Sequence, residues 1–158
     1  MASPEDIRTG LASVAPVAGR LSAQAGLNGV LVIDDCYNAN PGSARAAIDT
    51  LVASEGSSVL VMGAMRELGP DSVRLHRELG EYALQAGVER FWGVGEELQV
   101  AVEAFGEGGR WFAECEEAVM AAPGEFSAGD TVLIKGSRGA RMERVLKALV
   151  PPGNGGVH

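Results

Sequence analysis

Four short apolar runs divide this sequence, and segments with helix-like patterns separate them. The runs cover residues 30–33, 59–62, 91–94 and 132–134, and residues 110–113 form a weaker fifth. Runs that are short and uniformly apolar are typical of strands buried on both faces, as in a parallel sheet. The sequence therefore predicts a sheet that is covered on both sides.

The segments between these runs carry apolar residues at helical spacing. The clearest stripe lies within residues 44–52, where apolar side chains recur at i, i+3, i+4, i+7 and i+8. Similar stripes begin at Leu75, Leu98 and Met142, and a short helix is expected around Ala118. Strands that alternate with helices predict an α/β, Rossmann-like fold, with an open, mostly parallel sheet and helices on both faces.

Size and charge restrict the class of protein. A chain of 158 residues with 46% hydrophobic residues is long enough to bury one core, so we expect one globular domain. Its net charge of -8 repels polyanions, which makes nucleic acid and anionic membrane surfaces poor partners. The sequence contains neither a run long enough to span a bilayer nor the pattern of a signal peptide, so we expect a cytoplasmic protein.

The cysteines and histidines do not indicate a metal site. Cys36 and Cys115 are far apart and have no CxxC spacing, so both are interpreted as buried thiols. His76 falls within a predicted helix and His158 within the C-terminal tail. We therefore expect no metal ligands in this chain.

The first long polar string follows the first apolar run and reads DDCYNANP, residues 34–41. In open α/β sheets ligands bind beyond the carboxyl ends of the strands, so this position is informative. Asn40 before Pro41 is a good helix N-cap followed by a good first helical residue. Capping does not explain two adjacent carboxylates, a tyrosine and a second amide, and we interpret the string as part of a binding site.

The last apolar run leads into KGSRGAR, residues 135–141. Its two glycines allow close approach of the backbone, and its three cations favour an anionic ligand. Lys135 lies at the strand end, whereas Arg144 and Lys147 are expected only to solvate the outer face of a helix. The loop GAMRELGP, residues 63–70, follows the second run and is a candidate for another wall of the same crevice.

Taken together, these strings resemble a known family. GRL at residues 19–21, DDCYNANP, the loop that begins at Gly63, the segment from His76 to Gly80 and IKGSR at residues 134–138 are similar, in this order, to the C-terminal domain of the Mur ligases. The similarity extends over residues 7–149, and YNANP is typical of the branch that ligates D-alanyl-D-alanine. The sequence departs from the family pattern at Cys36, where serine is expected, and at Ala64, where aspartate is usual.

The resemblance implies that this chain is one domain of a larger ATP-dependent ligase. It divides the chain into residues 1–17, a helix and linker from a preceding ATP-binding domain, residues 18–150, the ligase domain, and residues 151–158, a disordered tail. The complete enzyme would use ATP and Mg²⁺ to phosphorylate UDP-N-acetylmuramoyl-tripeptide, and D-alanyl-D-alanine would then attack the acyl phosphate.

The resemblance also implies roles for individual residues. Arg20 and Asp35 would contact the nucleotide, with Asp35 placed for the ribose hydroxyls. The residues expected to line the closing face beside the nucleotide are Tyr37, Asn38 and Asn40. Those expected to hold the dipeptide and its carboxylate are Lys135, Ser137 and Arg138.

No catalytic residue is assigned to this chain. A phosphate-binding loop requires GxxxxGK[ST], and neither Lys135 nor Lys147 follows a glycine, so we expect the isolated chain to be inactive and to bind ATP and Mg²⁺ weakly. Two alternatives remain open. One is a domain of a related amide ligase, such as a folyl-polyglutamate synthase. The other is a stand-alone nucleotide- or anion-binding module of the same fold.

Overall fold

The computed structural model describes residues 22–36, 39–54, 56–136 and 141–150. These residues form a six-stranded sheet in the order β1-β2-β6-β3-β4-β5. The strands are β1 (Ser22–Ala25), β2 (Leu31–Asp35), β3 (Ser57–Met62), β4 (Arg90–Val94), β5 (Gly109–Phe112) and β6 (Asp130–Lys135). β1 pairs antiparallel with β2, and all other neighbouring strands pair in parallel.

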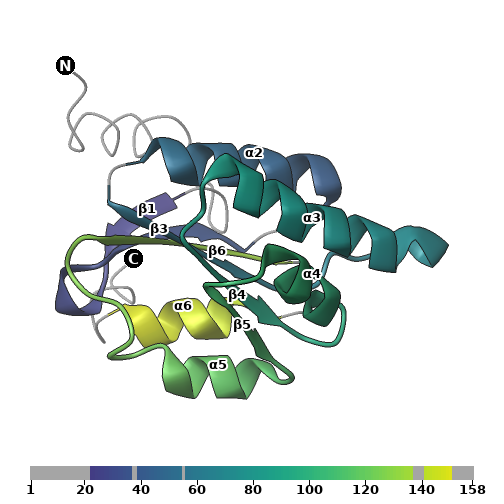
Figure 1. Cartoon of the computed structure of the whole chain (residues 1–158). Helices are drawn as coiled ribbons and strands as arrows, with labels where there is room; N and C mark the ends of the chain where they lie inside the picture. The colour runs from purple at the N-terminus through teal and green to yellow at the C-terminus, as the bar shows by residue number, and fades with distance from the viewer. Residues whose placement is uncertain (1–21, 37–38, 55, 137–140, 151–158) are drawn as a thin grey trace.

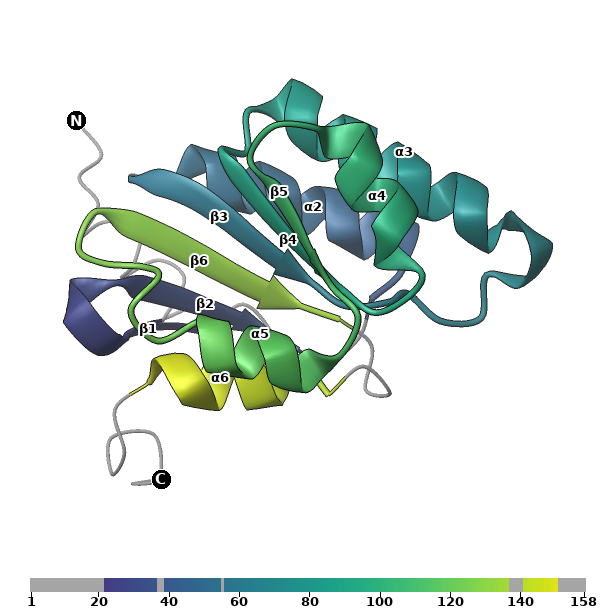
Figure 2. The same cartoon turned by 60° about the horizontal axis from the view of Figure 1, so that its bottom comes forward.

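Helices cover both faces of this sheet (Figures 1 and 2). The helices on one face are α2 (Pro41–Ala53), α3 (Ser72–Ala86) and α4 (Leu98–Phe105), and those on the other are α5 (Cys115–Ala121) and α6 (Glu143–Leu149). Two short 3-10 helices, η1 (Leu27–Gly29) and η2 (Gly69–Asp71), lie in connections. Each face has its own apolar cluster, because alternate residues of each strand point to opposite sides.

The α/β, mostly parallel architecture predicted from the sequence is confirmed. The four strong apolar runs and the weaker fifth form the five parallel strands. β1 was not expected, since the sequence Ser-Ala-Gln-Ala has neither an apolar run nor β-branched residues. This segment forms a strand because it pairs with β2 at the edge of the sheet.

The order in which the chain adds strands to the sheet changes direction at β6. From β2 the chain passes through α2 to β3, β4 and β5, and it returns through α5 to β6, between β2 and β3. The connection after β2 leads to α2 on one face, whereas the connection after β6 leads to α6 on the other (Figure 2). In open α/β sheets, ligands bind at the carboxyl ends of adjacent strands whose connections lead to opposite faces.

The close packing of α3 against α4 depends on Gly80. A Cβ atom built on Gly80 would overlap the backbone carbonyl oxygen of Ala101 in α4. We therefore expect Gly80→Ala to lower the free energy of unfolding by about 1–3 kcal/mol, as overpacking of a core does. Urea denaturation followed by circular dichroism would measure the loss. Gly87→Ala, at a left-handed position with open space around it, is a matched control that tests backbone strain without overlap.

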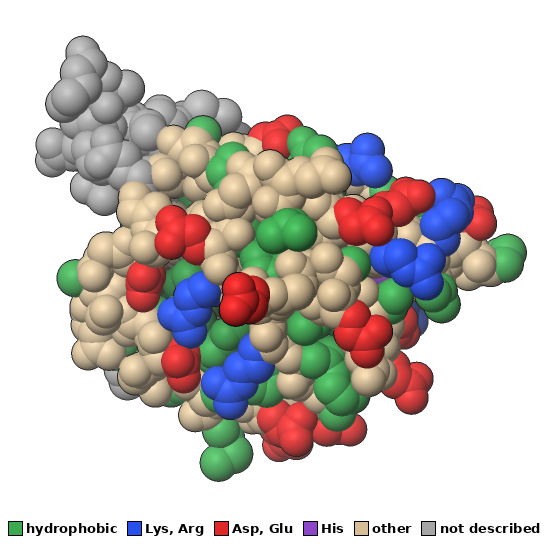
Figure 3. Space-filling view, viewed as in Figure 1, with side chains coloured by type: hydrophobic (Ala, Val, Ile, Leu, Met, Phe, Trp, Pro, Cys, Tyr) green, Lys and Arg blue, Asp and Glu red, His purple; other side chains and the backbone are tan. Residues whose placement is uncertain are grey.

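The surface of the described residues carries mixed charge. On the face in Figure 3, lysine and arginine side chains lie beside acidic ones. Among the described residues, none of the helices is long and apolar enough to cross a membrane.

Candidate functional site

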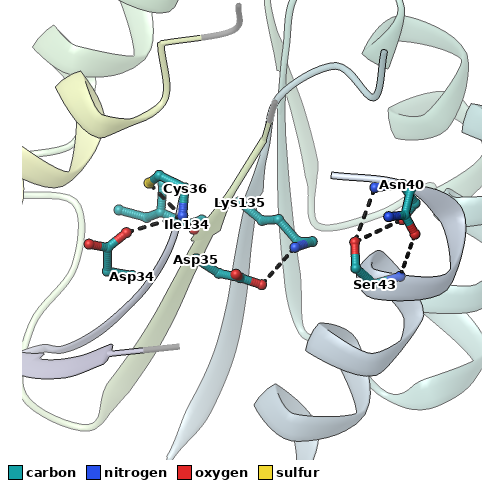
Figure 4. Close-up of polar contacts among 7 residues, drawn as sticks. All are labelled: Asp34, Asp35, Cys36, Asn40, Ser43, Ile134 and Lys135. Carbon is teal, nitrogen blue, oxygen red and sulfur yellow. Dashed lines mark hydrogen bonds and ion pairs between the residues drawn. The ribbon is translucent and has the colours of Figure 1, made fainter. Parts of the chain in front are cut away.

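An ion pair joins the carboxyl ends of β2 and β6. Asp35 and Lys135 are neighbours in the register of the two strands, and Lys135 Nζ donates to Asp35 Oδ2 at 2.7 Å (Figure 4). The Lys135 side chain is 2% exposed and that of Asp35 is 11% exposed. A buried charge is tolerated only when it is paired, so these residues depend on one another.

The residues beside Asp35 have local partners. Asp34 Oδ1 accepts a hydrogen bond from the backbone N–H of Cys36, and the Cys36 thiol lies 3.7 Å from the carbonyl oxygen of Ile134 (Figure 4). Burial, and then the nearby carboxylate of Asp34, raise the pKa of the Cys36 thiol well above its ordinary range. Cys36 is therefore a buried, protonated thiol, which agrees with the prediction from the sequence.

Asn40 caps α2, as predicted. Its Oδ1 accepts from the backbone N–H of Ser43 at 2.9 Å, and Ser43 Oγ accepts from the backbone N–H of Asn40 at 3.1 Å (Figure 4). With Pro41 as the first helical residue, this capping box fixes the point at which α2 begins. Asn40 remains exposed at this position.

The sequence predicts that the backbone approaches another group closely at the glycines after β6. At Gly136 the structure shows such an approach, and the group is another part of the protein. A Cβ atom there would lie 2.5 Å from Met142 Cγ and 3.2 Å from Gly63 Cα. The backbone N–H of Gly63 also donates to the carbonyl oxygen of Lys135 at 2.8 Å. β3 and β6 therefore separate only beyond this point, and the loop of residues 63–68 starts directly beside Lys135.

A pocket of about 410 Å³ opens further along the same edge of the sheet. It lies beyond the ends of β3, β4 and β5 and beside the start of α6. The residues that line it are Ala64, Arg66, Val94, Gly95, Glu97, Ala113, Glu114, Cys115, Glu116, Arg141 and Arg144. The loop after β3 thus forms one wall of a pocket at the carboxyl edge.

Three arginines meet at this pocket. Arg144 pairs with Glu116 at 3.5 Å, whereas Arg66 and Arg141 form no ion pair with the described residues. Arg141 and Glu67, which follows Arg66, also hold left-handed backbone conformations with φ of 57° and 62°. Such conformations are costly for residues other than glycine and tend to occur at functional sites.

Two expectations from the sequence are wrong at this pocket. Arg144 does not only solvate an outer helix face, because it is half-buried and lines the pocket with Glu116. Cys115 is half-buried instead of buried, because it begins α5 at the edge of the same pocket. Periodicity cannot show that the starts of α5 and α6 lie side by side.

A match to a protein family identifies the domain that contains this ion pair and this pocket. The model of the Mur ligase, glutamate ligase domain matches residues 19–138, which include β1 to β6. The chain belongs to the Mur ligase family. The sheet, the ion pair at the ends of β2 and β6, and the pocket are therefore features of a Mur ligase domain.

Curated relatives agree with this membership. The UDP-N-acetylmuramoyl-tripeptide--D-alanyl-D-alanine ligase of Escherichia coli is 38% identical over 94% of this chain, and that of Haemophilus influenzae is 34% identical over 91%. The corresponding ligase of Bacillus subtilis is 31% identical over 94% of the chain. The chain spans about a third of the length of these relatives, namely 33%, 32% and 34%.

Solved structures show the same domain within larger proteins. The MurF ligase of Thermotoga maritima in complex with ADP superposes with a TM-score of 0.73 at 32% identity, covering 87% of this chain and 32% of that one. MurF from Acinetobacter baumannii superposes with a TM-score of 0.74 at 33% identity, covering 90% of this chain and 32% of that one.

The structure brings together only part of the site expected from this Mur ligase sequence. It describes Asp35, Asn40 and Lys135, and it joins two of them in one ion pair although they were assigned to different ligands. Arg20, Tyr37, Asn38, Ser137 and Arg138 lie outside the described residues, as do the proposed boundary at residues 17–18 and the tail at residues 151–158. Arg141 was counted only among the three cations after β6, and Arg66 only as part of a candidate wall, so neither was assigned a ligand of its own.

Proposed function

We propose that this chain acts as the closing domain of an ATP-dependent ligase that adds D-alanyl-D-alanine to UDP-N-acetylmuramoyl-tripeptide in the cytoplasm. The observation that carries this proposal is the 38% identity, over 94% of the chain, to an Escherichia coli ligase of that name. The charged residues at the carboxyl ends of β2 and β6 support it, because a substrate-closing domain needs polar groups at such an edge. ATP phosphates and Mg²⁺ would be held by other domains of the ligase.

Asp35 would accept hydrogen bonds from the ribose hydroxyls of the nucleotide, with Arg20 nearby on the ribose or phosphate. Lys135 donates to Asp35 at 2.7 Å and so fixes the position of this carboxylate. Tyr37, Asn38 and Asn40 would line the closing face beside it. For Asn40 this role agrees with an exposed position at the start of α2.

The dipeptide would enter beside Lys135, Ser137 and Arg138. Since Lys135 already has a carboxylate partner in Asp35, arginines are the better ligands for the dipeptide carboxylate. Arg138 is one of them, and the pocket adds Arg66 and Arg141 at the same edge of the sheet. Glu97 in the same pocket supplies a negative charge for the dipeptide ammonium group.

The alternative of a stand-alone nucleotide module predicts a different result for the chain alone. If the ligase proposal is correct, the purified chain should fold cooperatively, hydrolyse no ATP and bind ADP weakly, since the phosphate contacts belong to other domains. Isothermal titration calorimetry with ADP and a phosphate-release assay would test this. Tight binding of ADP would favour the nucleotide module and contradict the ligase proposal.

A chimeric ligase would allow the proposed activity itself to be measured. In this chimera, residues 19–150 of the chain replace the aligned segment of the Escherichia coli ligase, which is 38% identical over 94% of the chain. ATP, the tripeptide nucleotide and the dipeptide can then be varied one at a time.

A further inference from the structure

His76 lies near the start of α3, fully buried, and touches the loop that follows β3. Its side chain is 0% exposed. Its Nε2 atom lies 3.1 Å from the backbone nitrogen of Met65, and its Nδ1 atom lies 2.8 Å from the carbonyl oxygen of Ser72. The imidazole therefore bridges the loop of residues 63–68 and the first turn of α3.

These two contacts determine where the proton of the imidazole lies. A backbone N–H only donates, so His76 Nε2 must accept from Met65 and carries no proton. The carbonyl oxygen of Ser72 only accepts, so Nδ1 carries the proton and donates it there. The arrangement requires a neutral imidazole with the proton on Nδ1.

The residue next to this contact lines the pocket. The Met65 side chain is buried among the apolar residues beneath α2, α3 and α4, while its backbone N–H is held by His76. Arg66 follows directly and lines the pocket, and Glu67 then turns the chain with a left-handed backbone. Met65 is thus held on two sides, which leaves Arg66 little freedom to move away from the pocket.

We propose that His76 is a positioning residue, whose Nε2 atom holds the Met65 amide and thereby keeps Arg66 at the wall of the pocket. This inference rests on the proposed function only for the identity of the ligand, the dipeptide. The hydrogen bond and its effect on the loop are independent of any ligand.

Two variants separate the contacts of His76. Glutamine places its side-chain oxygen near the position of Nε2 and can still accept from Met65, whereas asparagine reaches only as far as Nδ1 and retains only the contact with Ser72. We expect His76→Asn to speed hydrogen exchange of the Met65 amide roughly tenfold, in line with loss of one hydrogen bond. His76→Gln should leave this exchange close to that of the unchanged chain.

The same variants in the chimeric ligase test the effect on the ligand. His76→Asn should raise the KM for the dipeptide and leave the KM for ATP unchanged, and His76→Gln should restore the dipeptide KM. A purely structural contact would instead alter the fraction of folded enzyme, and so the apparent kcat, without this selectivity. Equal changes of both KM values would overturn the positioning role.

The test without mutation is the ¹⁵N spectrum of His76 in the full chain, which is decisive even if a variant fails to fold. A proton on Nδ1 is expected, and a proton on Nε2 would overturn the proposal. Unchanged exchange of the Met65 amide in folded His76→Asn, or equally faster exchange in both variants, would also overturn it. If the exchange results are as expected but the chimera does not use the dipeptide, the proposed function fails and the loop contact stands.

Discussion

Replacing Lys135 by methionine is expected to lower the free energy of unfolding of this chain by about 3–5 kcal/mol. The change removes the cation that lies 2.7 Å from Asp35 and leaves that carboxylate in a buried position at the end of β2. Methionine has a similar length, so loss of packing contributes little. Urea denaturation of the full chain, followed by circular dichroism, would measure the difference.

The chain contains its own control for this experiment. Lys147 is the only other lysine, it is exposed on α6, and Lys147→Met should change the free energy of unfolding by less than about 0.5 kcal/mol. The double variant Asp35→Leu with Lys135→Met should recover most of the loss, since it removes both buried charges. If Lys135→Met lowers the free energy of unfolding no more than Lys147→Met does, the ion pair does not stabilise the fold.

In the chimeric ligase, Arg138→Ala is expected to lower kcat/KM for the dipeptide by roughly tenfold to a hundredfold. Loss of a charged hydrogen bond costs about 1.5–3 kcal/mol, and each 1.4 kcal/mol is a factor of ten. The loss should be confined to the dipeptide, because a guanidinium that pairs with its carboxylate does not contact the nucleotide. Steady-state kinetics with each substrate varied in turn would measure it. An increase in the KM for ATP alone would place Arg138 at the nucleotide instead.

Asp35→Ala should have the opposite selectivity and raise the KM for ATP. Because this variant also breaks the ion pair with Lys135, Lys135→Met is its matched control: it breaks the same pair but keeps the carboxylate that would accept the ribose hydroxyls. We expect Asp35→Ala to raise the KM for ATP more than Lys135→Met does, with circular dichroism reporting the folded fraction. Equal effects of the two variants would reduce the role of Asp35 to supporting the fold.

Local patterns in the sequence were enough to predict most of the fold. The apolar runs at β2, β3, β4 and β6 are buried on both faces, and this leaves a continuous signal in the sequence. β1 has no such signal, because an edge strand of small and polar residues is defined by its pairing with β2 and not by its own side chains. The cap at Asn40 was predictable since all its partners lie within three residues.

The candidate site was less predictable because its contacts are long-range. Asp35 and Lys135 are 100 residues apart, and only the register of β2 with β6 makes them partners. The pocket likewise combines the ends of three strands with the starts of two helices, so no single segment of sequence indicated that Arg66 and Arg141 line the same pocket. The string DDCYNANP pointed to the carboxyl edge of the sheet, but which charges meet there depends on the order of the strands.

If this chain completes a ligase for D-alanyl-D-alanine, as proposed, the chimeric ligase should form the pentapeptide product. With ATP, UDP-N-acetylmuramoyl-tripeptide and D-alanyl-D-alanine, mass spectrometry should detect the UDP-muramoyl pentapeptide, and release of ADP should depend on the dipeptide. The same assay with the chimera lacking residues 19–150 should give neither. A chimera that folds and binds ATP but forms no pentapeptide, or that ligates glutamate in preference to the dipeptide, would show that the proposed function is wrong.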